Sequence, residues 1–155
     1  MRLRRGCRGW WIALVAALID RLTKRLAANL PAGGRTLIPG VVDLRRVQNR
    51  GMAFSMLSGQ SLLLAILTAL LIAGIVGWLI CRPDAGQLYR AGLWLIVGGG
   101  LGNLYDRLTA GSVLDFIELT FVRFAVFNVA DMCICVGAAL AILGSLTPKK
   151  AGDAS

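Results

Sequence analysis

The stretch "SLLLAILTALLIAGIVGWLI", Ser61–Ile80, runs for 20 residues without a charged side chain. At a rise of about 1.5 Å per residue, a helix of this length matches the roughly 30 Å hydrocarbon core of a bilayer. The whole composition also favours lipid as the solvent, because 57% of the 155 residues are hydrophobic and only 16% are charged. We therefore expect an integral membrane protein in which Ser61–Ile80 crosses the bilayer.

Three further apolar segments accompany this one, each interrupted by a few polar residues. The expected spans cover about residues 10–28, 61–80, 89–107 and 124–146. The first segment resembles a secretory signal peptide, but the charged cluster Asp20–Arg25 follows too soon for a cleavage site, so we expect it to be retained. The sequence predicts one all-α domain over residues 1–148 with four transmembrane helices, followed by a disordered tail at 149–155.

The formal net charge is +9, and the basic residues flank the apolar segments. Such a pattern is typical of contacts with lipid headgroups and of topology signals, so we expect no nucleic-acid partner. Lys and Arg are divided almost evenly between the two predicted sides, and only the dense basic N-terminus favours cytoplasmic chain ends. Between the first two spans, residues 35–58 are rich in Val, Leu and Phe and predict short strands of a small extramembrane sheet.

The sequence lacks the side chains that several common catalytic mechanisms and metal sites need. The chain has no His, and Cys7, Cys81, Cys133 and Cys135 show no CxxC spacing. Ser–His and Cys–His mechanisms and zinc ligation therefore lose their usual groups. We expect no metal and no organic cofactor.

Polar residues within the spans indicate a functional or structural role, because inserting a charged side chain at the bilayer centre costs about 2.5–3.5 kcal/mol of free energy. Those residues gather at span ends that share one membrane face: Asp20, Lys24, Asn103, Asp106, Arg107, Asn128 and Asp131. Their i,i+3 and i,i+4 spacings place them on common helix faces, although Asp20–Lys24 and Asp106–Arg107 could simply be ion pairs at helix ends. A GxxxG pair, Gly98 and Gly102, predicts close packing of the third helix.

Asp131 has no basic residue three or four positions away, so its partner must come from elsewhere in the fold. The candidate is Asp115 in "GSVLDFIEL", a carboxylate with apolar neighbours just before the last span. Two carboxylates in an apolar site cannot both ionise cheaply, so such a pair should share a proton and titrate as a unit. One member could then deprotonate a water while the other polarises a carbonyl, as in aspartic proteases.

Five short motifs follow one another along nearly the whole chain. They are "DRLTK" (Asp20–Lys24), "NRGMAFS" (Asn49–Ser55), "GNLYDRL" (Gly102–Leu108), "GSVLDFI" (Gly111–Ile117) and "FNVAD" (Phe127–Asp131). As an ordered set they resemble the lipoprotein signal peptidase, or signal peptidase II, family of bacterial inner membranes. The resemblance implies an intramembrane aspartyl endopeptidase that removes the signal peptide from diacylglyceryl-modified prolipoproteins, cutting just before the lipidated cysteine.

The resemblance also implies which residues act. Asp115 and Asp131 match the catalytic aspartates, and the positions that support the site or bind substrate are Asp20, Lys24, Asn49, Gly51, Asn103, Asp106, Arg107 and Asn128. Asn103 and Asn128 would hold the aspartates or the scissile carbonyl, whereas Asn49 and Arg107 suit contacts with substrate backbone or a lipid headgroup.

The same resemblance implies a location and partners. The active site would face the periplasm, both termini would be cytoplasmic, and the enzyme would act as a monomer on lipid-modified prolipoproteins within membrane lipid. Arg21, Met52 and Met132 depart from the family's usual Gln, Ala and Ser, which affects pocket detail rather than the carboxylates.

The residues alone leave two other classes of membrane protein open. A small transporter or proton channel would use Asp20, Asp106, Asp115 and Asp131 as a relay, and proton flux into liposomes would reveal it. A membrane scaffold would use its polar residues only to hold helices together, so Asp→Asn changes would be mild. The clustering of polar groups at one face favours the peptidase.

Overall fold

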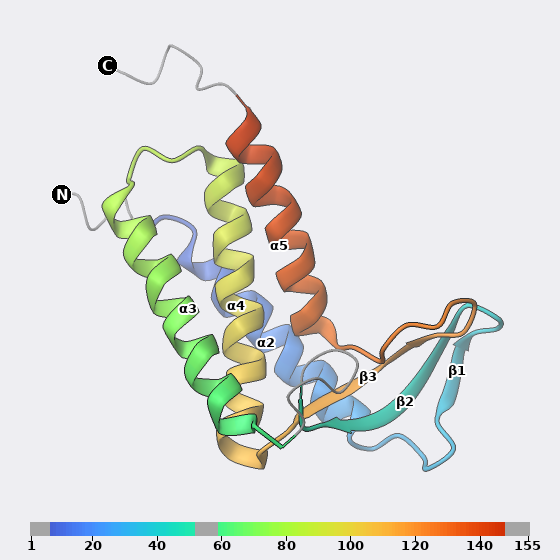
Figure 1. Ribbon diagram of the computed structural model, residues 1–155. Coiled ribbons are helices and arrows are strands. Elements are labelled where there is room, and N and C mark those ends of the chain that lie inside the picture. The colour runs from blue at the N-terminus through green and yellow to red at the C-terminus, as the bar shows by residue number, and fades with distance from the viewer. Residues whose placement is uncertain (1–6, 52–58, 148–155) are drawn as a thin grey trace.

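The computed structural model describes residues 7–51 and 59–147. Within these ranges it contains α2 (Trp10–Ala27), β1 (Arg35–Ile38), β2 (Val42–Asn49), α3 (Ser61–Cys81), α4 (Gln87–Ala110), β3 (Val113–Leu119) and α5 (Val129–Leu146). The helices form a bundle, and the strands form a small sheet that projects from one end of it (Figure 1). The predicted mostly helical fold with a small sheet is therefore confirmed, while Met52 and the tail at 149–155 lie outside the described residues.

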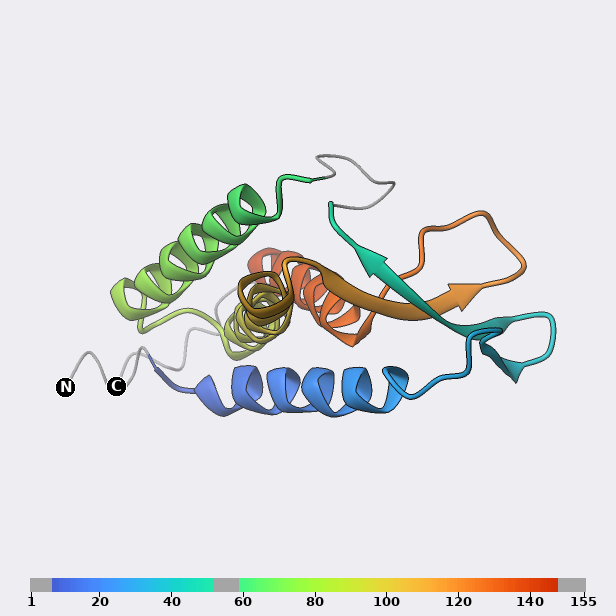
Figure 2. The same cartoon turned by 90° about the horizontal axis from the view of Figure 1, so that it is seen from below.

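Helix α4 is the centre of the bundle and packs against α2, α3 and α5 (Figure 2). Glycines permit these close approaches. A Cβ atom at Gly98 would lie 2.7 Å from both the Ala13 carbonyl oxygen and the Ala16 Cβ atom of α2, and one at Gly102 would collide with the Asp20 carboxylate. The predicted close packing at Gly98 and Gly102 is thus confirmed, and α2 is the helix that these glycines face.

The surface of the bundle suits a lipid surrounding. Helices α3 and α5 are long and apolar enough to cross a membrane. Leucines such as Leu62 and Leu70 of α3 point outward and are 70% and 65% exposed, as expected for side chains that meet acyl chains rather than a protein core. Helices α2 and α4 carry charged residues instead. Asp20, Lys24 and Asp106 are buried at the sheet end of the bundle, whereas Arg90 is buried near the start of α4, where it donates to the Pro83 and Arg8 carbonyls.

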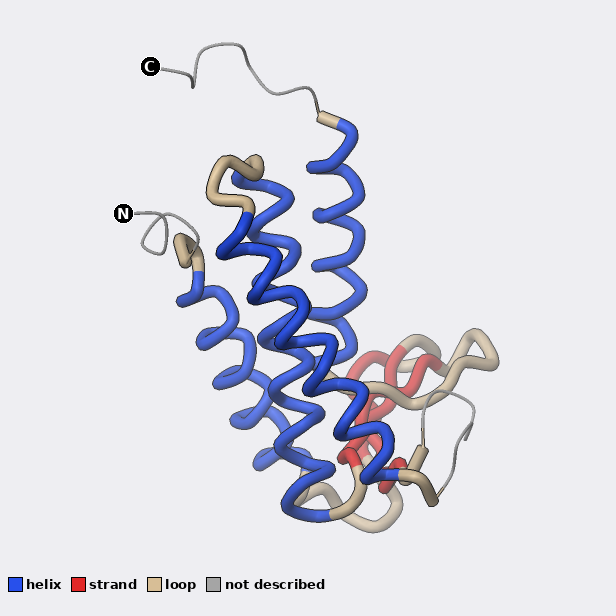
Figure 3. The backbone as a smooth tube through the Cα atoms, turned by 60° about the vertical axis from the view of Figure 1, so that its left-hand side comes forward, coloured by secondary structure: helices blue, strands red, loops and turns tan. Residues whose placement is uncertain are grey.

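The sheet has the order β1-β2-β3, and both pairings are antiparallel. The strands lie together at one end of the helices (Figure 3). In the β2–β3 register Val47 lies opposite Asp115 and Asn49 lies opposite Val113. Asn49 and Asp115 are therefore diagonal neighbours across the two strands, a spacing within reach of a polar contact. The sheet thus carries Asp115 to the same end of the bundle as the polar helix ends.

Helix α5 begins at Val129, five residues later than the expected span at 124–146. The preceding residues lie along β3 instead, where Phe127 pairs with Ile117. Asn128 then caps the helix: its Oδ1 accepts a 3.0 Å hydrogen bond from the Asp131 N–H, and Asp131 Oδ2 accepts one of 3.2 Å from the Asn128 N–H. This capping box places Asp131 in the first turn of α5 rather than two turns inside it.

Candidate active site

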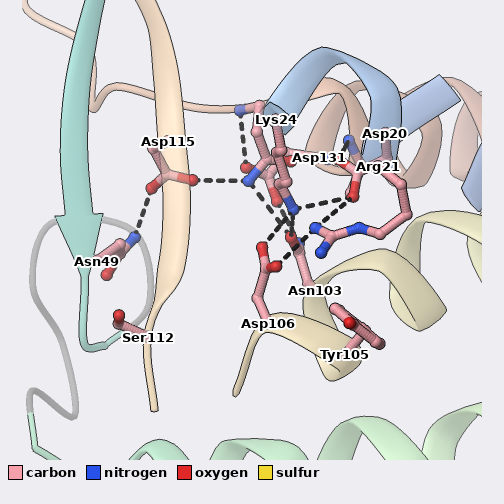
Figure 4. Close-up of polar contacts among 12 residues, drawn as sticks. Asp20, Arg21, Lys24, Asn49, Asn103, Tyr105, Asp106, Ser112, Asp115 and Asp131 are labelled. Atoms are coloured by element: carbon pink, nitrogen blue, oxygen red, sulfur yellow. Dashed lines mark hydrogen bonds and ion pairs between the residues drawn. The ribbon is translucent and has the colours of Figure 1, made fainter. Parts of the chain in front are cut away.

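Asp115 and Asp131 reach one site from two different elements, β3 and the first turn of α5. Asn128 contacts both, since its side-chain Nδ2 donates to Asp115 Oδ1 at 2.6 Å and its backbone N–H donates to Asp131 Oδ2 at 3.2 Å. Asn128 is fully buried. Figure 4 shows Asp115 on its strand and Asp131 within the adjoining cluster of polar side chains. The structure therefore joins the two carboxylates through a single residue that has no freedom to move into solvent.

Asp115 is buried and has an amide on each side. The Asn49 Nδ2 donates to Asp115 Oδ2 at 2.9 Å, and the Asn49 Oδ1 in turn accepts the Gly51 N–H at 2.9 Å. Burial raises the pKa of Asp115 from its ordinary 3.8 to about 6, and the nearby Asp131 carboxylate adds to the effect, against the hydrogen bonds from Asn49 and Asn128. Asp115 can thus exchange a proton near neutral pH.

This pKa makes stability depend on pH in a definite direction. Because the folded protein holds the Asp115 proton more tightly than the unfolded chain, this contribution to stability is complete below about pH 4 and is lost as the pH rises through about 6. Asp115→Asn stays neutral throughout. We expect its unfolding temperature in detergent, relative to wild type, to rise between pH 4.5 and pH 7.5; a difference that does not vary with pH would contradict this.

Asp131 is held by a second amide, from α4. The Asn103 Nδ2 donates to Asp131 Oδ1 at 2.8 Å, while the Asn103 Oδ1 accepts from Lys24 Nζ at 3.0 Å and from Asn128 Nδ2 at 3.3 Å. Both oxygens of Asp131 therefore have donors, one from Asn103 and one from the helix cap. The side chain is fixed in direction before any substrate arrives.

A buried ion-pair network lies behind these residues. Lys24 Nζ contacts Asp20 Oδ2 at 3.0 Å and Asp106 Oδ2 at 2.7 Å, and Arg21 Nη2 contacts Asp106 Oδ1 at 2.6 Å. The Asp20–Lys24 pair predicted from spacing is present, but Asp106 pairs with cations of α2 rather than with Arg107. The other oxygen of Asp20 accepts the Ala130 N–H at 3.1 Å, which ties α2 to the start of α5.

Two arginines make contacts within the fold that the sequence does not predict. Arg107 Nη2 donates to the Gly51 carbonyl at 3.1 Å, so it links α4 to the backbone just after β2. Arg21, which the sequence marked only as a departure, belongs to the ion-pair network and lies 4.7 Å above the Tyr105 ring. No sequence pattern predicts the pairing of Arg21 with Asp106, because the two residues are 85 positions apart. Helical spacing does not link Arg21 with its neighbour Asp20 either, since adjacent residues of a helix point to different faces.

Asn128 should matter to both stability and activity. Asn128→Ala removes the cap and the bond to Asp115, so we expect a loss of about 0.5–2 kcal/mol in unfolding free energy together with reduced cleavage. The matched control is Gln60→Ala, because Gln60 occupies the same cap position of α3 and makes no side-chain cap bond there. Equal losses from both substitutions in detergent unfolding and cleavage assays would contradict the assignment.

A cavity of about 920 Å³ adjoins the site on the sheet side. Asp115, Asn49 and Gly51 line it together with residues of the segment after β3, including Arg123 and Phe124. Its size is in the range of ligand-binding pockets, and Asp115 lies in its wall. Across residues 7–51 and 59–147 no group of three or more His, Cys, Asp or Glu side chains is placed to hold a metal ion.

Known proteins match this chain over nearly its whole length. The family model described as signal peptidase (SPase) II matches residues 12–147. A lipoprotein signal peptidase of Streptococcus pneumoniae is 38% identical over 144 residues, covering 92% of this chain and 94% of the relative. One from Thermosynechococcus vestitus is 34% identical over 145 residues, with 90% and 92% covered.

The fold agrees with these sequence matches. A solved bacterial membrane enzyme, determined by the in meso method at 2.3 Å resolution, superimposes with a TM-score of 0.80 at 28% identity, covering 94% of this chain and 93% of that one. A second such structure, at 1.9 Å resolution, gives a TM-score of 0.78 at 29% identity. On the family match, the relatives and the shared fold, this chain belongs to the signal peptidase II family, the lipoprotein signal peptidases.

Proposed function

We propose that this chain is an aspartyl endopeptidase that cuts lipid-modified prolipoproteins just before the lipidated cysteine, with Asp115 and Asp131 as its catalytic residues. Membership of the family supports the removal of signal peptides from prolipoproteins. The observation that carries the finer assignment is the contact of the buried Asn128 with both carboxylates, one from β3 and the other from the first turn of α5.

The two carboxylates divide the chemistry of hydrolysis. The ionised member takes a proton from a water as its oxygen attacks the scissile carbonyl carbon, and the protonated member gives its proton to the carbonyl oxygen. The first member then passes the proton taken from water to the leaving nitrogen as the C–N bond breaks. The second member takes a hydroxyl proton from the tetrahedral intermediate, which becomes the new carboxyl group, and the pair is restored. The pKa of about 6 at Asp115 suits a group that must both hold and release a proton.

The surroundings suit a substrate that arrives within the membrane. We propose that all four helices span the inner membrane, with both chain ends in the cytoplasm and the sheet at the periplasmic surface. The apolar outer faces of α3 and α5 support this, as does the collection of the polar groups at the sheet end of the bundle. A diacylated precursor would reach Asp115 and Asp131 by lateral diffusion, and the 920 Å³ cavity would take the peptide near its cleavage site.

The lipid requirement tests this proposal. We expect purified enzyme in detergent to convert a diacylglyceryl-modified prolipoprotein to the mature form and to leave the same precursor intact when its cysteine is unmodified. A gel shift quantified over time reads out both reactions. Equal cleavage of the two precursors would overturn the proposed substrate class, and cleavage of neither would overturn the proposed activity.

A further inference from the structure

We propose that Lys24 is a positioning residue for the reaction: it fixes the side-chain amide of Asn103 so that this amide orients Asp131. The inference rests on the proposed function, because it needs Asp131 to be catalytic. Lys24 is only 3% exposed and begins a chain of polar contacts that runs from α2 through Asn103 of α4 to Asp131 of α5 (Figure 4).

The direction of the Asn103 amide follows from what Lys24 can do. An ammonium group only donates, so the Asn103 atom 3.0 Å from Lys24 Nζ must be the oxygen. The nitrogen then faces Asp131 Oδ1 at 2.8 Å and donates to it. Without Lys24 only the longer 3.3 Å bond from Asn128 Nδ2 would hold that oxygen, so the amide could turn over, set its oxygen against the Asp131 carboxylate and lose the bond to it.

Lys24 is itself fixed by two carboxylates. Its Nζ lies 3.0 Å from Asp20 Oδ2 and 2.7 Å from Asp106 Oδ2, and all three side chains are buried. Asp20 also accepts the Ala130 N–H, so the same turn of α2 holds the backbone next to Asp131. Helix α2 therefore positions the first turn of α5 in two ways, through the backbone at Ala130 and through the Asn103 side chain.

The charge of Lys24 also reaches Asp115. The charged groups that act on Asp115 are Asp131 from α5, Lys24 from α2 and Arg107 from α4, whereas β2 supplies the neutral Asn49. Burial is the main effect and raises the pKa of Asp115, and the Lys24 cation works against it. Loss of this cation should therefore raise the pKa of Asp115 further, whereas looser packing that admits water would lower it.

Steady-state cleavage of a diacylglyceryl-modified prolipoprotein by the full chain in detergent, followed from pH 5 to pH 8, tests the inference. We expect Lys24→Met to lower kcat by about 10- to 100-fold, with KM within about twofold of wild type, since a misdirected catalytic group costs rate more than binding. The step in the pH profile that belongs to Asp115 should move to higher pH.

A double-mutant cycle separates positioning from a general loss of stability. If Lys24 acts through Asn103, the double variant Lys24→Met/Asn103→Ala should be no slower than Asn103→Ala alone. The matched control is Arg21→Gln, which alters the same network without touching Asn103 and should keep kcat within about twofold of wild type. Lys24→Gln removes the charge but keeps a polar side chain, so it replaces Lys24→Met if the methionine variant does not fold.

Four results would overturn the inference. Additive losses in the cycle would mean that Lys24 does not act through Asn103. A raised KM with unchanged kcat would mean that Lys24 meets substrate from the cavity of about 240 Å³ that it borders. If Lys24→Met has the kcat of the wild type while Asp131→Asn is inactive, this inference alone fails. If the wild type is itself inactive, the proposed function fails as well.

Discussion

Asp115→Asn and Asp131→Asn are each expected to reduce cleavage of a lipid-modified precursor by about 10²- to 10⁴-fold while the protein stays folded. Asparagine has nearly the shape of aspartate, so the contacts with Asn128 can persist in part, but it can neither accept the proton of a water nor give one to a carbonyl oxygen. Initial rates in detergent, measured beside unfolding temperatures, separate lost chemistry from lost structure.

A buried aspartate outside the proposed pair provides the control for these variants. Asp106→Asn removes one charge from the ion-pair network and leaves both Asp115 and Asp131 unchanged. Asp106→Asn should lower the unfolding free energy more than either of the other substitutions, because it leaves Lys24 and Arg21 with one fewer counter-charge. It should reduce the cleavage rate less than either of them. An Asp115→Asn variant that is folded and as active as wild type would show that the reaction does not use this carboxylate.

Gly99→Ala is expected to lower both stability and cleavage, although it adds only one methyl group. The Cβ atom would collide with the Ala130 carbonyl oxygen of α5 and lie 2.9 Å from Ile134 Cγ1. A backbone atom cannot rotate away, so α5 must shift, at a cost of about 1–3 kcal/mol. Because Ala130 precedes Asp131, a shift approaching 1 Å would also slow cleavage by about 10²-fold.

Gly74→Ala on α3 is the matched control for this variant, since nothing lies within 4 Å of a Cβ atom at that position. There the same change should be neutral or should stabilise the helix by up to about 1 kcal/mol, and cleavage should be unaffected. Thermal unfolding and initial rates of the two variants decide the matter. A Gly99→Ala protein as stable and as active as Gly74→Ala would contradict the close α4–α5 packing.

Much of the architecture follows from local patterns in the sequence. The uncharged run at Ser61–Ile80 predicts a helix, and α3 covers Ser61–Cys81. The start of α5 was predicted wrongly because residues 124–127 are as apolar as the helix itself, so periodicity does not mark the boundary. Asn128 marks it instead, as the cap residue, with Asp131 at the third helical position.

The sequence indicates which residues belong to the candidate site better than it indicates which of them contact one another. Helical spacing places Asn103 and Asp106 on one face of α4, and it pairs Asp20 with Lys24. It cannot show that Asp106 turns to α2 while Arg107 turns to Gly51, because both partners are distant in sequence. The diagonal pairing of Asn49 with Asp115 likewise depends on the β2–β3 register, which the sequence alone does not specify.

The most direct test of the account is a mass measurement on both fragments released from one diacylglyceryl-modified prolipoprotein by the wild-type enzyme and by Asp131→Asn. The account predicts that the wild type yields a mature fragment beginning with the lipidated cysteine and a signal peptide ending one residue earlier, and that Asp131→Asn leaves the precursor intact. Fragments of the same masses from folded Asp131→Asn at the wild-type rate, or an intact precursor after treatment with the wild type, would contradict it.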